Sequence, residues 1–154
     1  RNGVAKPIEH EWVRFTAQRW FYDDETPKTA TLNRKLQTLL AAFKAVFGAI
    51  RRHVRYVRDT EGADLYQIPM RTLQIGAGDC DDHSSLLAAM LISIGYPVRY
   101  RVIRSRGAHD WNHIYVLVGL PPGEPDRWIP LDTTVARPPG WQAPDVAARR
   151  DFPV

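Results

Sequence analysis

The chain has 154 residues, of which 44% are hydrophobic and 25% are charged, as in a folded globular protein rather than a disordered or fibrous one. This length suits one domain, and we expect a single domain over residues 1–154. No apolar run approaches the ~18 residues of a membrane span, so we expect no membrane partner. The single cysteine, Cys80, cannot form an internal disulfide, which slightly favours a reducing, cytoplasmic location.

The net charge of +4 comes from 21 basic and 17 acidic residues. The densest basic segment is 51–58, in which Val54 and Val57 stand three residues apart. That spacing predicts the solvated side of an amphipathic helix rather than a surface that holds phosphates. We therefore expect no nucleic-acid partner, and the oligomeric state stays open.

The N-terminal half is predicted to be mainly helical. Residues 8–22 are rich in aromatic and β-branched side chains without a clear period, so helix and strand both stay open there. From Thr31 to about Asp59, apolar residues recur at steps of three and four, which predicts one long amphipathic helix. Turn formers between residues 60 and 69 predict an irregular connection.

A second amphipathic helix is predicted from Asp81 to Ile94. Its apolar residues again share one face, and Gly95 followed by Pro97 supplies a stop signal. Cys80 therefore lies in the first turn of this helix.

Three strands are predicted after that helix. Apolar and β-branched residues alternate or cluster in segments 98–102, 114–118 and 128–132, with turn formers between the last two. The last twenty residues, 135–154, are rich in proline and predict an irregular tail.

Cys80 is the first candidate for chemistry. A thiol attacks carbonyl groups as the thiolate, and its pKa falls from ~8.5 to roughly 3.5–7.5 at a helix N-terminus or beside an imidazolium. A lone cysteine can also be a small buried apolar residue. The neighbours Gly78, Asp79, Asp81 and Asp82 are not typical core residues, so they favour a reactive thiol.

A base must take the thiol proton, and histidine is the usual choice near neutral pH. His83 follows Cys80 by three residues on the same helix, which leaves little room for a substrate between thiol and imidazole, so it ranks second. His113 opens one predicted strand and Asp132 closes the next. A hairpin centred between residues 122 and 123 would make them cross-strand neighbours, so that the carboxylate orients the imidazole.

Donors for an oxyanion are also needed. The Cys80 backbone N–H is available at the helix start. We name Gln74, upstream of the cysteine, and Trp111 and Asn112, beside the histidine, as candidate oxyanion or substrate-binding residues.

These motifs together resemble a known family. Residues 78–82, 86–91 and 94–99 resemble the nucleophile helix of bacterial and phage transglutaminase-like proteins, while 113–116 and 128–134 resemble that family's histidine and aspartate strands in the same order. The resemblance covers roughly residues 54–134. It departs from the family where Thr133 follows the aspartate, since proline is frequent there.

The resemblance implies a papain-like α+β fold. In such a fold the nucleophile stands at the N-terminus of a core helix packed on an antiparallel sheet that carries histidine and aspartate. Carried over by position, the triad would be Cys80, His113 and Asp132. The residues considered without the resemblance lead to the same set.

The resemblance implies acyl transfer through a thioester. Hydrolysis of a peptide or side-chain amide is the leading hypothesis, with a peptide or protein as substrate and no cofactor, and transglutamination is the runner-up. A non-catalytic binding module on the same fold is disfavoured by the intact set of cysteine, histidine and aspartate. A zinc site from Cys80, His109 and His113 is disfavoured because no second cysteine supports it.

A calcium site is a weaker alternative. Asp79, Asp81 and Asp82 flank Cys80, and some transglutaminase-like proteases bind calcium at acidic residues around the nucleophile. Consecutive carboxylates at a helix start are more often partners of the helix dipole, whereas Ca²⁺ takes six to eight oxygen ligands. We therefore expect no metal there.

Overall fold

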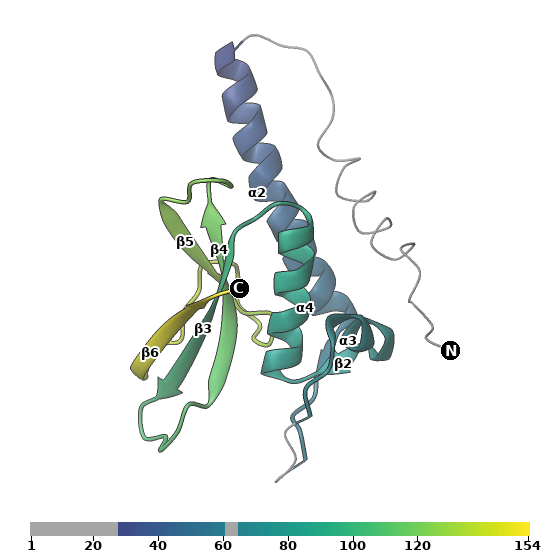
Figure 1. Ribbon diagram of the computed structural model, residues 1–154, viewed down its shortest axis with the longest axis vertical. Coiled ribbons are helices and arrows are strands. Elements are labelled where there is room, and N and C mark those ends of the chain that lie inside the picture. The colour runs from purple at the N-terminus through teal and green to yellow at the C-terminus, as the bar shows by residue number, and fades with distance from the viewer. Residues whose placement is uncertain (1–27, 61–64) are drawn as a thin grey trace, which may run out of the picture.

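The structure is a computed structural model that describes residues 28–60 and 65–154; segment 8–22 lies outside the described residues. Helices and short strands alternate as far as α4, and the remaining strands follow one another (Figure 1). The elements are α2 (Lys28–His53), β1 (Arg55–Tyr56), α3 (Pro69–Ile75), β2 (Ala77–Gly78), α4 (Cys80–Ser93), β3 (Val98–Ser105), β4 (His113–Leu120), β5 (Arg127–Leu131) and β6 (Val146–Pro153).

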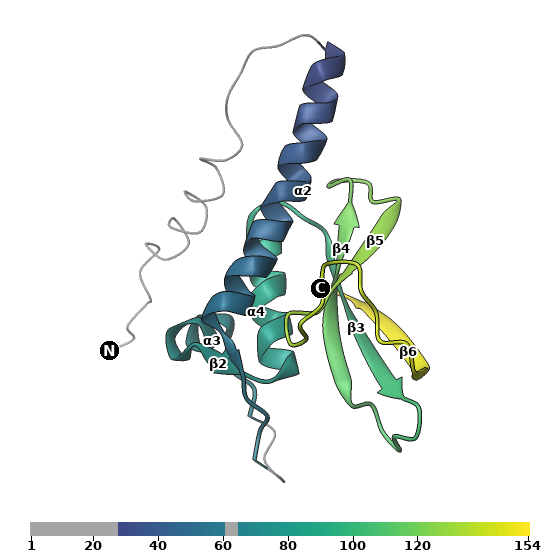
Figure 2. The same ribbon diagram turned by 180° about the vertical axis from the view of Figure 1, so that it is seen from behind.

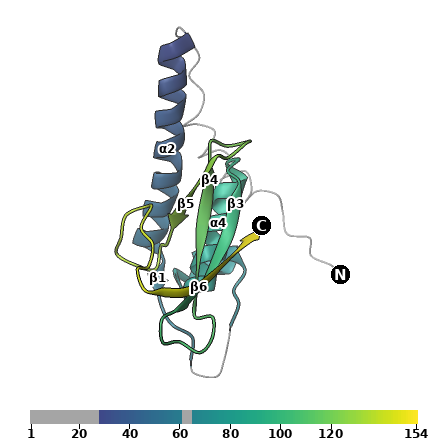
Figure 3. The same cartoon turned by 90° about the vertical axis from the view of Figure 1, so that its left-hand side faces the viewer.

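Strands β5, β4, β3 and β6, in that order, form an antiparallel sheet with helices on one face (Figures 1 and 3). Alternate residues of β3 and β4 pack into the core that α4 shares, namely Val98, Tyr100, Val116, Val118 and Leu120, and α2 packs on α4 in turn. The main core lies between helices and sheet. Its most deeply buried members include Phe43, Leu87, Leu91, Val116, Val118 and Leu131.

The opposite face of the sheet carries a smaller core. Ile103, Tyr115 and Leu117 are buried there against residues that include Trp128 and Val146. The segment that joins β5 to β6 reaches the last turn of α2, where the Arg51 guanidinium donates to a backbone carbonyl of that segment (Figure 2).

Helix α2 ends earlier than predicted. The predicted helix continued to about Asp59, but the chain leaves the helix after His53, and β1 pairs in parallel with β2. The backbone N–H groups of Arg55 and Val57 donate to the carbonyls of Gly76 and Gly78, both at 2.8 Å. These long-range partners compete with helix continuation. The predicted helical face over residues 51–58 is therefore wrong beyond residue 53.

Helix α3 was not predicted. It begins at Pro69, where a proline costs no hydrogen bond because the first N–H groups of a helix have no intrahelical acceptor. It ends at Gly76, whose φ of 66° lies in the left-handed region that glycine tolerates best. A helix of seven residues carries too short an apolar pattern to be found from its sequence.

The prediction of an irregular tail over residues 135–154 is wrong for its second half. Residues 146–153 form β6, which pairs antiparallel with β3 as the outer strand of the sheet. The strand contains two arginines, an aspartate and a proline, so its own composition does not favour a strand. Pairing with β3 supplies the stabilisation that its local sequence lacks.

The remaining predictions of secondary structure are confirmed. Helix α4 matches the predicted helix within one residue, and it ends before Gly95, which has a φ of 88°. The three predicted strands correspond to β3, β4 and β5. Within the described residues, no helix combines the length and the apolar character needed to cross a membrane.

Candidate active site

The start of α4 is fixed by a reciprocal cap. The carboxylate of Asp79 accepts hydrogen bonds from the backbone N–H groups of Asp81 and Asp82, at 3.1 and 3.4 Å. In return, Asp82 accepts from the backbone N–H of Asp79 at 3.3 Å. This capping box makes Cys80 the first residue of the helix, where its partly exposed thiol stands beside the positive end of the helix dipole.

A serine one turn later ties this helix start to the sheet. The Ser84 hydroxyl lies 2.7 Å from the carbonyl oxygen of Cys80 and 3.2 Å from that of Ile114 in β4. Ile114 directly follows His113. The first turn of α4 is thereby held beside the strand that carries the histidine.

The predicted partnership of His113 and Asp132 is present in the structure. The His113 Nε2 and Asp132 Oδ2 atoms are 2.7 Å apart, and the Asp132 side chain is 4% exposed. The other oxygen of Asp132 accepts hydrogen bonds from the backbone N–H and the hydroxyl of Thr134, at 3.0 and 2.6 Å. Three donors therefore hold this carboxylate in one orientation.

The predicted register of this hairpin is wrong by a shift of two residues. Val116 pairs with Leu131, so the next pair along the ladder sets Asp132 opposite Tyr115 rather than opposite His113. A shift by two keeps each side chain on the same face of the sheet, since the side-chain period is two. His113 and Asp132 therefore meet diagonally.

The local charges favour a protonated imidazole. Burial by itself lowers the pKa of His113, but hydrogen bonds and Coulomb attraction from Asp132 and Cys80 outweigh burial and raise this pKa to about 9. Burial likewise raises the pKa of Asp132, but His113 and Thr134 reverse the effect and hold it below its usual value. The structure thus brings the three predicted residues together.

His83, the second-ranked base, is directed elsewhere. It is 1% exposed, and a hydrogen bond of 3.0 Å joins its Nδ1 to the hydroxyl of Thr133. Burial is the main cause that lowers its pKa, although the Arg55 backbone and nearby aspartates oppose this. Its Nε2 has no hydrogen-bond partner within the described residues. His83 links α4 to the segment that carries Asp132.

The three candidate donor side chains occupy different places. Gln74 lies exposed on α3, and no hydrogen bond in the described part of the chain ties it to the site. The Asn112 side chain is hydrogen-bonded to Ser105 within the β3–β4 connection. Trp111 is 45% exposed in the same connection. A role of these three side chains in binding an oxyanion stays a prediction.

A residue that the sequence did not single out supports the site. The backbone N–H of Gln67 donates to Asp82 Oδ1 at 2.8 Å, and its side-chain amide donates to Asp82 Oδ2 at 2.6 Å. A Cβ at Gly78 would lie 2.5 Å from the Cβ of Asp82, so a glycine is required there. Gln67 stands in a segment predicted to be irregular, and no local signal pointed to it.

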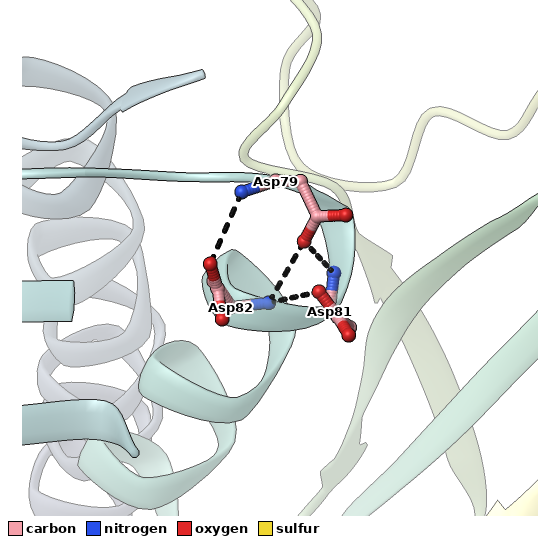
Figure 4. A group of neighbouring side chains, drawn as sticks. All are labelled: Asp79, Asp81 and Asp82. Atoms are coloured by element: carbon pink, nitrogen blue, oxygen red, sulfur yellow. Dashed lines mark hydrogen bonds between the residues drawn. The ribbon is translucent and has the colours of Figure 1, made fainter. Parts of the chain in front are cut away.

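Three carboxylates lie close together at the start of α4 (Figure 4). One oxygen from each of Asp79, Asp81 and Asp82 falls within 4.8 Å of the others. Both oxygens of Asp82 already accept hydrogen bonds from Gln67, so Asp79 and Asp81 are the residues best able to hold a cation. Burial, followed by the nearby Asp79, raises the pKa of Asp81 to about 7.

The zinc alternative is not favoured by the structure. Within residues 28–60 and 65–154, the aspartate trio is the one group with the geometry of a metal site. His109 lies exposed in the β3–β4 connection, and the set of Cys80, His109 and His113 is not brought together as ligands.

Comparisons with known proteins identify the fold and the superfamily. The profile of the transglutaminase-like superfamily matches residues 28–133. Among solved structures, the EGTA-treated form of Legionella pneumophila LapG is 18% identical, with 89% of this chain and 77% of that chain covered and a TM-score of 0.56. The calcium-bound form of LapG is also 18% identical, with 89% of this chain and 80% of that chain covered and a TM-score of 0.57. A candidate cysteine protease from Cytophaga hutchinsonii is 17% identical, with 99% of this chain and 50% of that chain covered and a TM-score of 0.51.

No curated protein sequence matches the chain significantly. At identities below 20%, the solved structures show the fold, and the expected α+β, transglutaminase-like fold is confirmed. The profile covers well over half of the chain, including Cys80, His113 and Asp132. The chain therefore belongs to the transglutaminase-like superfamily.

Proposed function

We propose that the chain is a thiol-dependent enzyme of the cysteine-peptidase type, which hydrolyses a peptide or side-chain amide through a thioester on Cys80. One observation carries the proposal: His113 is hydrogen-bonded to Asp132 at 2.7 Å, and Cys80 at the start of α4 acts together with Asp132 to raise the pKa of this imidazole. A nucleophile, a base and an orienting carboxylate in contact form the arrangement that activates a thiol.

The chemistry would proceed in two steps. The Cys80 sulfur attacks the amide carbonyl carbon, the C–N bond breaks, and the protonated His113 gives its proton to the departing amine. Water then attacks the thioester while His113 accepts a proton from it, which releases a carboxylic acid and regenerates the thiol. Asp132 keeps the imidazole oriented and stabilises its charged form throughout.

The oxyanion of each tetrahedral intermediate would need donors. The backbone N–H of Cys80 belongs to the first residue of α4, where an N–H has no acceptor within the helix. It is therefore our first candidate for an oxyanion donor.

The proposal is tested first on the thiol. Cys80 is the one cysteine of the sequence, so intact-mass measurement of iodoacetamide labelling reports on it alone. We expect rapid labelling well below pH 8 in the wild type and loss of that low-pH reactivity in His113→Ala, because the imidazolium that favours the thiolate is removed. His109→Ala, an exposed histidine of the neighbouring connection, is the matched control and should label like the wild type. An unchanged pH profile of labelling in His113→Ala would rule out that His113 activates Cys80.

The second test separates hydrolysis from transamidation. A library of quenched-fluorescent peptides is incubated with the protein in the presence and absence of a primary amine, and products are identified by mass. Hydrolysis yields a free acid whether or not the amine is present. A transglutaminase would instead transfer the acyl group to the amine. Failure of the wild type to process any peptide, or equal turnover in Cys80→Ala, would overturn the proposal.

We propose, second and contrary to the expectation from the sequence, that Asp79 and Asp81 bind Ca²⁺. In each carboxylate one oxygen accepts a hydrogen bond from a backbone N–H at the start of α4. Burial, followed by the neighbouring Asp79, raises the pKa of Asp81 to about 7, and a cation between the two carboxylates would offset their mutual repulsion. LapG, which shares the fold, was solved in a calcium-bound form. A bound cation would add positive charge beside Cys80.

Melting in millimolar Ca²⁺, in Mg²⁺ and in EGTA tests this second proposal. Ca²⁺ should raise the melting temperature of the wild type, because a ligand that binds only the folded state stabilises it. Asp81→Asn should abolish the shift, whereas Asp126→Asn, an exposed aspartate in the β4–β5 connection, should retain it. Equal melting temperatures of the wild type in Ca²⁺ and in EGTA would exclude the site.

A further inference from the structure

A pocket of about 290 Å³ lies on the sheet, lined by Val102, Trp111, Arg150 and Phe152. Val102 pairs with Ile114 on one side and with Arg150 on the other, so these three side chains share a face of the sheet. Tyr100 and Val116 form the pair two positions away from Val102 and Ile114, so they lie on the same face of the sheet. Both belong to the core that is shared with α4. The pocket therefore opens on the side of the sheet that faces α4.

The pocket is connected to the candidate active site across the strands. Ser84, one turn after Cys80 in α4, contacts the carbonyl of Ile114 in β4. Val102 in β3 pairs with Ile114 on one side and with Arg150 of β6 on the other. Neighbouring strands are about 4.8 Å apart, which puts β6 about 10 Å from β4. About three residues of an extended peptide span that distance. A peptide with its reacting carbonyl at Cys80 could thus reach the pocket.

The walls of the pocket combine aromatic surface with a positive charge. Trp111 and Phe152 are 45% and 41% exposed, which is high for large apolar side chains. The Arg150 guanidinium lies 5.6 Å from the centre of the Trp111 ring. No carboxylate of the described residues lies within ion-pair distance of Arg150, whereas its neighbour Asp151 is bound to Arg101 at 2.7 Å on the other side of the strand.

We propose that this pocket is a subsite for a peptide substrate: it takes an apolar side chain between Trp111 and Phe152, and Arg150 pairs with a carboxylate on an adjacent residue of the same peptide. The inference rests on the proposed function, because that function supplies the peptide. The volume of about 290 Å³ is at the low end of ligand pockets and leaves room for a large side chain. Because no carboxylate of the described residues pairs with the Arg150 guanidinium, we expect the pocket to prefer a peptide with an acidic residue next to the apolar one.

Binding to the Cys80→Ala protein tests the subsite without any turnover. Three fluorescein-labelled peptides that differ at one position, Leu-Glu, Leu-Gln and Leu-Lys in the same alanine-rich host, are compared by fluorescence anisotropy. We expect Leu-Glu to bind about tenfold more tightly than Leu-Gln, as for one added hydrogen bond between charged groups. Adding Arg150→Glu should transfer the preference to Leu-Lys. Adding Phe152→Ala should weaken all three.

Arg149→Glu provides the matched control. Arg149 stands next to Arg150 in β6 and is also exposed, but it pairs with Ile103 and lies on the other face of the sheet. This substitution makes the same change of charge and should leave the preference for Leu-Glu intact. Equal affinity for the three peptides, or equal effects of the two arginine substitutions, would overturn the subsite. Failure of the proposed function would be detected separately, because the labelling and turnover assays use the protein that retains Cys80.

Discussion

Two buried aspartates lie near Cys80, and their partners differ. Asp82, 1% exposed, accepts hydrogen bonds from the backbone and side-chain amide of Gln67 and from a backbone N–H of the helix cap. Asp132, 7% exposed, accepts from Thr134 and from the imidazole of His113. Neutral amides do not change their charge at ordinary pH, whereas an imidazole can gain or lose a proton there.

This difference separates two roles at one site. Asp82 joins α4 to the segment before α3 and holds the helix start in position. Asp132 holds a group that can carry a proton to and from a substrate. Replacing a buried acceptor should therefore reduce stability in the first case and turnover in the second.

The largest expected effect follows Asp132→Asn. A carboxamide keeps the approximate shape but cannot stabilise an imidazolium, so turnover should fall by about 10³–10⁴-fold while the melting temperature changes by only a few degrees. Peptide turnover and thermal melts measure the two quantities on the same samples. A joint collapse of stability and turnover would make Asp132 a structural residue like Asp82.

The second-largest expected effect is a pH dependence of stability that involves Asp132 but not Asp82. The folded-state pKa of His113 is about 9, above its ordinary value of 6.5, so its contribution is fully present below pH 6.5 and is lost as the pH rises through 9. We expect the free energy of unfolding in urea to decrease by up to a few kcal/mol across this window.

Two variants identify the source of that slope. Asp132→Asn should flatten it, because the raised pKa depends on the carboxylate. Asp82→Asn should lower stability at every pH but keep the slope. A slope that survives in Asp132→Asn would point to other titrating groups.

Asp82→Asn should reduce the free energy of unfolding by about 1–3 kcal/mol. An NH₂ group in place of Oδ1 would lose the hydrogen bond from the Gln67 backbone N–H, and one in place of Oδ2 would lose those from the Gln67 side-chain amide and the Asp79 N–H. Urea denaturation measures the effect, and the exposed Asp126→Asn should change stability by less than about 0.5 kcal/mol. A neutral result for Asp82→Asn would mean that this network contributes little to the helix start.

The smallest expected effects come from two adjacent threonines. Thr133→Val removes the hydroxyl that is hydrogen-bonded to the buried His83, so the free energy of unfolding should fall by about 1 kcal/mol. Its turnover should change less than the turnover of Thr134→Val. Thr134→Val removes a donor to Asp132 and should act mainly on turnover. Paired melts and turnover assays test this, and the reverse ranking would contradict it.

The sequence was most informative where the signals are local. The apolar period of α4 and its glycine stop are contained within residues 81–95, so the helix and the place of Cys80 at its start could be predicted. Alternating apolar residues likewise indicated β3, β4 and β5. The face shared by His113 and Asp132 was predictable because the side-chain period of a strand is two, even though the register was not.

The sequence by itself therefore determined which residues begin a helix or strand and which chemical groups those elements carry. Only the tertiary structure decided that β1 replaces the end of the predicted helix, that β6 completes the sheet, that Gln67 binds Asp82, and that Arg150 stands over Trp111. Each of these depends on partners distant in the chain. Their stabilisation arises from pairing and burial after folding, and a short segment carries no trace of that in its own composition.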